Sequence, residues 1–308
     1  ILERDVRDPI ARAAQLQDRG AGGLIVVTDK EPDDHQTDYV RPTAESQDLT
    51  IPVFEITGAA FETLLGRLGV EYRDLASAPP ALPLDVQVRQ SIARSPVTTT
   101  LTANILGLLP GSDHRLENEV LIVGAHYDHI GESPDGLFFP GANQNASGVA
   151  ALLEMAGVWQ SVGYHPARSV LFAAWGAEEL GGAGMAHYLV APAIPLTRTV
   201  GVIALDSIAA GGGPKLMFYG TREHEQSLIQ RVEAAAARLD RRAWRRGSTG
   251  EGWHTSLNQT GIPTVKFIWD DAEGDFYLPT DTADRIDPDY LATSGEILTL
   301  AATWLAGW

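Results

Sequence analysis

The chain has 308 residues, of which 44% are hydrophobic and 20% are charged, and it contains no cysteine. This length and composition predict a globular protein of about two domains with a sizeable core. The lack of cysteine excludes disulfides, cysteine–zinc sites and thiol nucleophiles, and the net charge of −17 argues against nucleic acid or an anionic membrane surface as a partner.

Two features of the sequence concern membrane insertion and processing. No run of about 18 or more apolar residues occurs, so the sequence predicts no membrane span. The chain begins at Ile1 rather than Met and lacks a signal-peptide pattern, so we expect a processed or truncated product.

The first 82 residues predict a small unit of their own. Apolar spacing and glycine breaks indicate, in chain order, a helix at 10–16, a strand at 24–27, a polar surface loop at 28–50, a strand at 51–54 and a helix at 58–68. Residues 76–83 are rich in alanine and proline and are expected to form a linker.

Two segments of this unit resemble the later half of a protease-associated domain, a small lid often inserted in metallopeptidases. They are RGAGGLIVV at 19–27 and IPVFEITGAAFETLL at 51–65. The first strands of such a domain are missing from the sequence. We therefore predict a partial protease-associated-like domain with its linker over 1–82 and a larger domain over 83–308.

The larger domain predicts an α/β fold. Alternating patterns at 84–88 and 97–108 suggest an antiparallel pair, and the remaining elements are buried strands at 120–125, 170–175, 200–205 and 262–268 and helices at 148–158, 223–239 and 290–304. Continuous apolar strands that alternate with helices indicate a sheet covered on both faces. The basic run at 241–246 is expected to be a solvated helix end.

Polar side chains follow three of these strands directly. His126 ends the first strand, Glu178 and Glu179 follow the second, and Asp206 follows the third. Ligands of such sheets bind where the strands end, so these side chains can share one crevice. Each residue alone is commonly structural, but imidazole nitrogen and carboxylate oxygen together are zinc ligands.

The same residues suggest a division of roles. In the Glu178–Glu179 pair, one carboxylate can bind metal while its neighbour acts as a general base. Asp128 lies two positions after His126 on an extended segment, and we expect its carboxylate to orient the imidazole from behind.

The motifs of the larger domain resemble the successive blocks of the M28 family of zinc aminopeptidases and carboxypeptidases. The blocks are GAHYDHIG at 124–131, PGANQNASGVAALLE at 140–154, ARSVLFAAWGAEELGGAGMAHYL at 167–189, VIALDSIA at 202–209, GIPTVKF at 261–267 and LPTDTADRID at 278–287. The resemblance implies a three-layer α/β/α domain with a mixed central sheet. It also implies zinc as the cofactor, peptide or protein N-termini as substrates, and a secreted or extracytoplasmic location.

The resemblance further implies a role for each site residue. One zinc ion would be held by His126 and Asp206, and the other by Glu179 and a histidine shortly before the last block. An aspartate in the glycine-rich turn would bridge the two ions, and Glu178 would be the general base.

Two of the five implied ligand positions do not match. The bridging aspartate falls on Gln144, a neutral amide, and the last histidine falls on Tyr277, whose phenol has an ordinary pKa of about 10. A further block that usually reads Ser-Asp-His has Trp253 in place of its aspartate, before His254.

Other catalytic signatures are incomplete. His224 and Glu225 begin a zincin motif but lack the second histidine, and neither a nucleophile elbow nor a P-loop occurs. Three interpretations stay open: a degenerate homologue that is weakly active or inactive, a working aminopeptidase with one metal or with substitute ligands such as His129 or His254, and an active enzyme altered at Gln144 or Tyr277. We favour the first and expect at most one zinc ion per chain, or none.

Overall fold

A computed structural model describes most of the chain. The described residues are 2–4, 6, 9–28, 49–69, 87, 89, 99–133, 136–220, 226–247, 252–272 and 277–307. The chain divides into two compact units, residues 1–100 and 101–308. The predicted linker at 76–83 and the predicted boundary after residue 82 lie outside the described residues.

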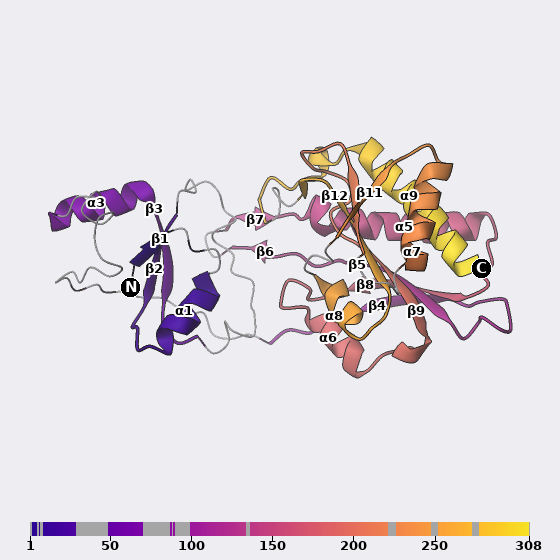
Figure 1. Cartoon of the computed structure of the whole chain (residues 1–308), viewed down its shortest axis with the longest axis horizontal. Helices are drawn as coiled ribbons and strands as arrows, with labels where there is room; N and C mark the ends of the chain where they lie inside the picture. Colours follow the sequence, from indigo (N-terminus) through magenta and orange to yellow (C-terminus); the bar gives the residue numbers. More distant parts are fainter. Residues whose placement is uncertain are drawn as a thin grey trace. The chain divides into compact units, whose positions relative to one another are not determined.

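The first unit is a small sheet with two helices (Figure 1). Its elements are β1 (Leu2–Arg4), α1 (Pro9–Gln17), β2 (Leu24–Thr28), β3 (Val53–Thr57) and α3 (Gly58–Leu68), and its parallel sheet has the order β1-β2-β3. Alternate residues of β2 point to opposite faces. Leu24 and Val26 pack with α1, and Val27 packs with Phe61 and Leu65 of α3.

The prediction for this unit is confirmed in its main elements. Both helices and β2 occur where they were expected, and the second strand begins two residues later than predicted. Thr57 caps α3 by accepting the N–H of Ala60 at 3.2 Å, and Gly69 ends it in the left-handed region. The protease-associated resemblance stays a prediction, since β1–β3 and two helices do not by themselves define such a domain.

The second unit is built on a mixed seven-stranded sheet of order β11-β10-β12-β9-β5-β8-β4. The strands are β4 (Ile105–Leu109), β5 (Val120–His126), β8 (Ser169–Trp175), β9 (Thr199–Leu205), β10 (Leu216–Tyr219), β11 (Ala243–Arg246) and β12 (Thr264–Trp269). The β4–β8 and β10–β12 pairs are antiparallel and the other neighbours are parallel. A two-stranded ribbon of β6 (Gly131–Glu132) and β7 (Phe138–Phe139) follows β5.

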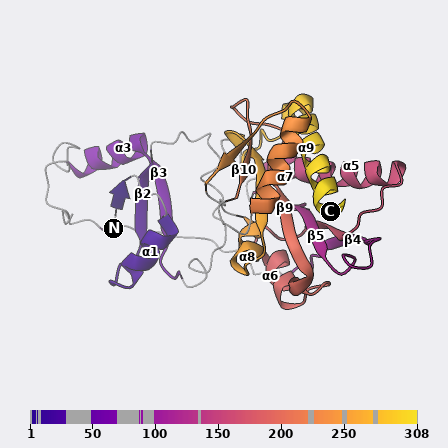
Figure 2. The same cartoon turned by 45° about the vertical axis from the view of Figure 1, so that its right-hand side comes forward.

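Helices cover both faces of this sheet. The long helices α5 (Ser147–Ser161), α7 (Gln226–Arg238) and α9 (Pro288–Gly307) lie on one face, and α6 (Ala183–Val190) and α8 (Trp253–Gln259) lie on the other (Figures 1 and 2). The fully buried strand β5 serves both layers: Leu121 and Val123 join the first core cluster, and Val120 and Ile122 join the second. The predicted three-layer α/β/α fold with a mixed sheet is confirmed.

Some predicted elements differ from the structure. The basic run at 241–246 is not a helix end: its last four residues form β11, which pairs with β10 at the edge of the sheet. The predicted strand at 97–108 is reduced to β4, whose partner is β8, and most of 84–88 lies outside the described residues. Within the described part of the chain, none of the helices has the length and apolar character needed to cross a membrane.

Candidate metal centre

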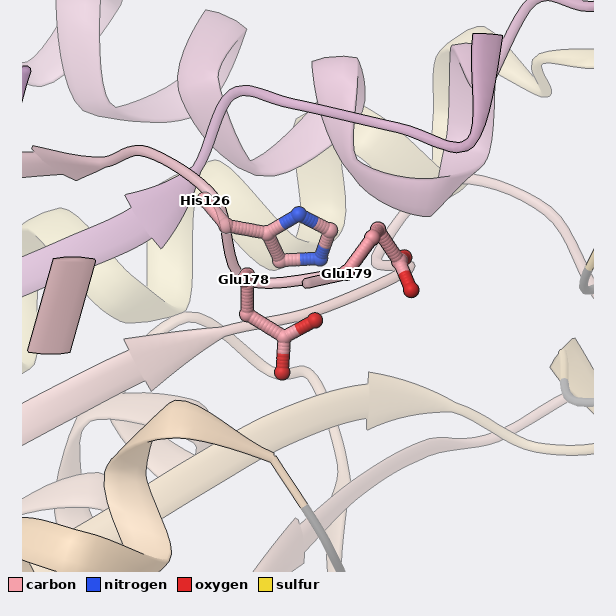
Figure 3. Close-up of side chains that lie close together, drawn as sticks. All are labelled: His126, Glu178 and Glu179. Carbon is pink, nitrogen blue, oxygen red and sulfur yellow. The ribbon is translucent and has the colours of Figure 1, made fainter. Parts of the chain in front are cut away.

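The candidate site lies where three neighbouring parallel strands end. His126 is the last residue of β5, Glu178 and Glu179 lie in the loop after β8, and Asp206 follows β9. All four side chains are buried. One ligand atom from each of His126, Glu178 and Glu179 lies within 4.8 Å of the others, and Figure 3 shows these three side chains gathered beyond the strand ends.

His126 and Asp206 face each other across two adjacent strands. The Nε2 atom of His126 lies 3.9 Å from Oδ1 of Asp206, so the predicted convergence is present. The Nδ1 atom of His126 lies 3.0 Å from the backbone carbonyl oxygen of Asp128. A proton on Nδ1 can be donated to that carbonyl, which leaves the Nε2 lone pair directed into the site. Nε2 has no hydrogen-bond partner among the described residues.

The sequence predicted that the carboxylate of Asp128 orients His126, but the structure shows a different contact. The Oδ1 atom of Asp128 is 3.8 Å from Nδ1 of His126, beyond hydrogen-bond range, and the backbone carbonyl of Asp128 makes the contact instead. The carboxylate accepts the backbone N–H groups of Glu178 and Glu179, each at 3.0 Å. Asp128 therefore fixes the backbone of the glutamate pair and makes its hydrogen bond to the imidazole through its main-chain carbonyl.

Asn104 fixes the loop after β8 from the side of the edge strand β4. Asn104, just before β4, donates to the carbonyl oxygen of Gly184 at 2.8 Å and accepts the N–H of Gly176 at 3.2 Å. A Cβ atom on Gly184 would collide with the carbonyl oxygen of Gly176 and with the Asn104 side chain. The strand end and the start of α6 are therefore in direct backbone contact.

Gln144, at the position implied for the bridging aspartate, lies buried in the turn Ala142–Ala146 before α5. Its side-chain oxygen accepts a hydrogen bond from the hydroxyl of Ser207, the residue after Asp206. The turn is held by Asp281, whose carboxylate accepts the backbone N–H groups of Asn143 and Gln144 at 2.7 and 3.0 Å. The structure thus brings Gln144 beside Asp206 as a neutral group.

Tyr277, at the position implied for the last histidine, reaches the opposite side of the site. Its hydroxyl donates to Oε2 of Glu179 at 3.0 Å, and its ring stacks on His129 with centroids 5.9 Å apart. His129 lies with Nδ1 3.7 Å from Oε1 of Glu179. A phenol that donates a hydrogen bond occupies the position where the resemblance implies a metal-binding imidazole, and His129 lies close enough to Glu179 to be a substitute ligand.

Lys266 is a site residue that the sequence analysis did not identify. It lies on β12, and its Nζ atom is 2.6 Å from Oδ2 of Asp206, with only 6% and 9% of the two side chains exposed. Burial alone raises the pKa of the Asp206 carboxyl, but the charge of Lys266 and the neighbouring imidazoles outweigh burial and hold this pKa below its ordinary value. A single lysine inside the apolar run 262–268 was the available signal.

His254, the other suggested substitute ligand, is the second residue of α8. It is buried, and its imidazole is one of the groups that lower the pKa of Asp206. Trp253 before it packs on Trp175, the last residue of β8, with ring centroids 5.4 Å apart. The position that usually carries an aspartate is therefore part of the core in this chain.

The donor set fits one metal ion better than two. Asp206 is already paired with the ammonium of Lys266, and the bridging position holds an amide that accepts from a hydroxyl. Among the described residues, Gln144 and Tyr277 stand at two of the positions for which the family resemblance implies metal ligands. The His126, Glu178 and Glu179 cluster retains one nitrogen and two carboxylates, which is the donor chemistry of a single zinc site.

A mixed sheet between two helical layers, with imidazole and carboxylates gathered at its strand ends, defines a metallopeptidase-like α/β domain. The model of peptidase family M28 matches residues 104–302, which is just under two thirds of the chain. The chain belongs to this family.

Several known proteins are similar to the chain. Aminopeptidase YwaD of Bacillus subtilis is 28% identical over 66% of the chain and 45% of its own length, and the probable lipoprotein aminopeptidase LpqL of Mycobacterium tuberculosis is 30% identical over 59% of the chain and 30% of its own length. The solved structure of an aminopeptidase from Aneurinibacillus sp. strain AM-1 aligns with 99% of the chain and 69% of its own chain, at 22% identity and a TM-score of 0.73. The chain spans less than half the length of the curated relatives it matches.

Proposed function

We propose that this chain is an aminopeptidase-like member of family M28 whose two-zinc peptidase activity is weak or absent. The observation that carries the proposal is the contact between Tyr277 and Glu179. At the position where the family resemblance implies a histidine ligand, a neutral phenol donates a hydrogen bond to the carboxylate that would share the ion. Gln144 supports the same conclusion, because an amide bonded to Ser207 cannot supply the charge of a bridging carboxylate.

The remaining residues keep part of the catalytic arrangement. A zinc ion, when bound, would supply an activated water and a positive centre for the developing oxyanion. We propose that Glu178 is the proton acceptor; in support, Asp128 fixes the backbone on which Glu178 lies. A base alone contributes little without a well-held nucleophile, so we propose that the crevice binds the N-terminal ends of peptides or proteins and hydrolyses them slowly or not at all.

A second candidate is a working aminopeptidase that uses one metal ion. The cluster of His126, Glu178 and Glu179 supports it, and so does His129, whose Nδ1 atom is 3.7 Å from Glu179. Both ring nitrogens of His129 are buried and lack hydrogen-bond partners among the described residues, as expected of an imidazole that could turn toward an ion. The zinc aminopeptidases among the structural neighbours are consistent with zinc as that ion.

Hydrolysis of aminoacyl p-nitroanilides by the purified chain tests the proposal. We expect turnover close to background, with and without added zinc. Glu178→Gln is the matched control, because any activity that survives loss of this carboxylate comes from a contaminant. Turnover that is chelator-sensitive and is abolished in Glu178→Gln would contradict the proposal. If His129→Ala, made in the otherwise unmodified chain, also loses this turnover, the one-metal candidate is established.

Restoring the missing ligands gives a second test. Gln144→Asp alone should improve zinc binding more than turnover, because Tyr277 still occupies the other ligand position. The double change Gln144→Asp with Tyr277→His should exceed the two single changes combined, since ligands of one site act as a unit. Additive single and double effects would show that these two positions do not belong to one metal site.

A further inference from the structure

We propose that the ammonium of Lys266 is a built-in cation that takes the place of one metal ion at Asp206, so that the centre is constructed for one divalent ion. The proposal rests on the proposed function only in locating the centre at these strand ends. It assigns to Lys266 a role in deciding how many metal ions the chain can hold.

The position of Lys266 demands a paired charge. It lies on β12, all six of whose residues are buried, between β9 and β10 in the sheet. A buried ammonium is stable only when it is paired and hydrogen-bonded. Its Nζ atom lies 2.6 Å from Oδ2 of Asp206, a distance typical of a direct charge-assisted hydrogen bond.

The two oxygens of Asp206 face different partners. Oδ2 meets the ammonium of Lys266, and Oδ1 faces Nε2 of His126 at 3.9 Å. A second divalent ion bound at Asp206 would therefore lie next to an ammonium that is fixed on the same carboxylate. Two cations this close repel strongly in a buried site, and Gln144 adds no negative charge to compensate.

The formal charge of the centre supports the same count. With neutral imidazoles, the charged side chains that meet at the strand ends are the carboxylates of Glu178, Glu179 and Asp206 and the ammonium of Lys266, which together carry two negative charges. The carboxylates of Asp128 and Asp281 bind backbone N–H groups of the surrounding loops instead. One divalent ion neutralises the charge of the four groups at the strand ends, and a second would exceed it. The His126, Glu178 and Glu179 cluster is the part of the centre with ligand atoms close enough to hold that single ion.

Zinc binding by Lys266 variants tests the proposal. The purified chain and Lys266→Met are equilibrated with buffered zinc, and zinc per chain is measured by elemental analysis and affinity by competition with a chromophoric chelator. We expect the unmodified chain to hold at most one ion. Lys266→Met should gain one further ion per chain, bound at least about a hundredfold more tightly than any second ion in the unmodified chain, because removal of a like charge within about 4 Å lowers the repulsion.

Four variants control this result. Lys266→Arg retains the cation and should not gain an ion, and Lys215→Met removes the same charge from the face of Trp244, outside the centre. Lys266→Met leaves Asp206 buried without its partner and can fail to fold. Lys266→Gln keeps a hydrogen-bond donor for Asp206, and zinc should raise its melting temperature. Adding Asp206→Asn to Lys266→Gln should abolish the gained ion.

The outcomes separate this inference from the proposed function. Equal zinc content in the unmodified chain, Lys266→Gln and Lys266→Met would overturn the role of Lys266, and so would two tightly held ions in the unmodified chain. Chelator-sensitive hydrolysis by an unmodified chain that holds a single ion would contradict the proposed low activity but would leave the role of Lys266 supported.

Discussion

Replacing Asp128 tests whether its carboxylate fixes the glutamate pair. In Asp128→Ala, the backbone N–H groups of Glu178 and Glu179 lose the acceptor that each contacts at 3.0 Å. Hydrogen bonds to charged groups contribute about 1.5–3 kcal/mol each, and the lower end applies because 19% of the Asp128 side chain is exposed. For two bonds, we expect the free energy of unfolding to fall by about 3 kcal/mol.

This loss is large enough to measure by thermal and urea unfolding. For a unit of this size, each 1 kcal/mol lowers the melting temperature by about 2–4 °C, so the variant should melt roughly 6–12 °C below the unmodified chain. Asp128→Asn keeps one oxygen acceptor, so its melting temperature should lie between those of Asp128→Ala and the unmodified chain. Asp113→Ala is the control, because its exposed carboxylate accepts a single N–H from Arg115 at 2.7 Å.

If Asp128→Ala melts at the same temperature as the control Asp113→Ala, the reasoning is refuted. In that case the two N–H groups find other acceptors, such as water, and the carboxylate does not fix the loop. A loss of zinc affinity without loss of stability would instead indicate that Asp128 acts on His126, as the sequence first suggested.

Three further predictions concern the same region. Tyr277→Phe removes the hydroxyl that donates to Glu179 and should cost about 1–2 kcal/mol in urea unfolding, whereas no change would mean that water replaces it. Gly184→Ala places a methyl group against backbone and should cost about 1–3 kcal/mol or more, and a variant as stable as the original would contradict the close approach. The lowered pKa of Asp206 stabilises the fold at pH values above 3.8, the ordinary value of an unfolded aspartate, and this contribution is lost as pH falls through the lowered pKa. The stability difference between the unmodified chain and Asp206→Asn should therefore shrink on acidification below that value, and a difference that grows would contradict it.

The sheet was predictable where the strands are continuous apolar runs. Apart from the exposed Val200 and the half-buried Phe172, residues 120–125, 170–175 and 200–205 are buried, so their apolar composition alone identified β5, β8 and β9. The short strands β1 and β10 have only three and four residues, too few for a periodic signal. The edge strand β11 carries exposed arginines, and its polar sequence is indistinguishable from a solvated helix end.

The site was predictable to the extent that it follows chain order. His126, Glu178 and Glu179 come directly at or after strands that are neighbours in the sheet, so the apolar pattern located them. Lys266 could not be placed in this way, because β12 joins the sheet between β9 and β10 out of chain order. Its approach to Asp206 depends on that insertion and on the register that pairs Lys266 with Ala204, neither of which the sequence pattern specifies.

The backbone contact between Gly176 and Gly184 limits how the centre can be redesigned. Asn104 hydrogen-bonds to the backbone of both glycines, and a side chain on Gly184 has no room, so variants with a side chain at position 184 are expected to lose stability. Positions 144, 266 and 277 contribute their side chains to the centre from other segments. An engineer who seeks a new metal specificity should randomise these three positions and leave Gly176 and Gly184 unchanged.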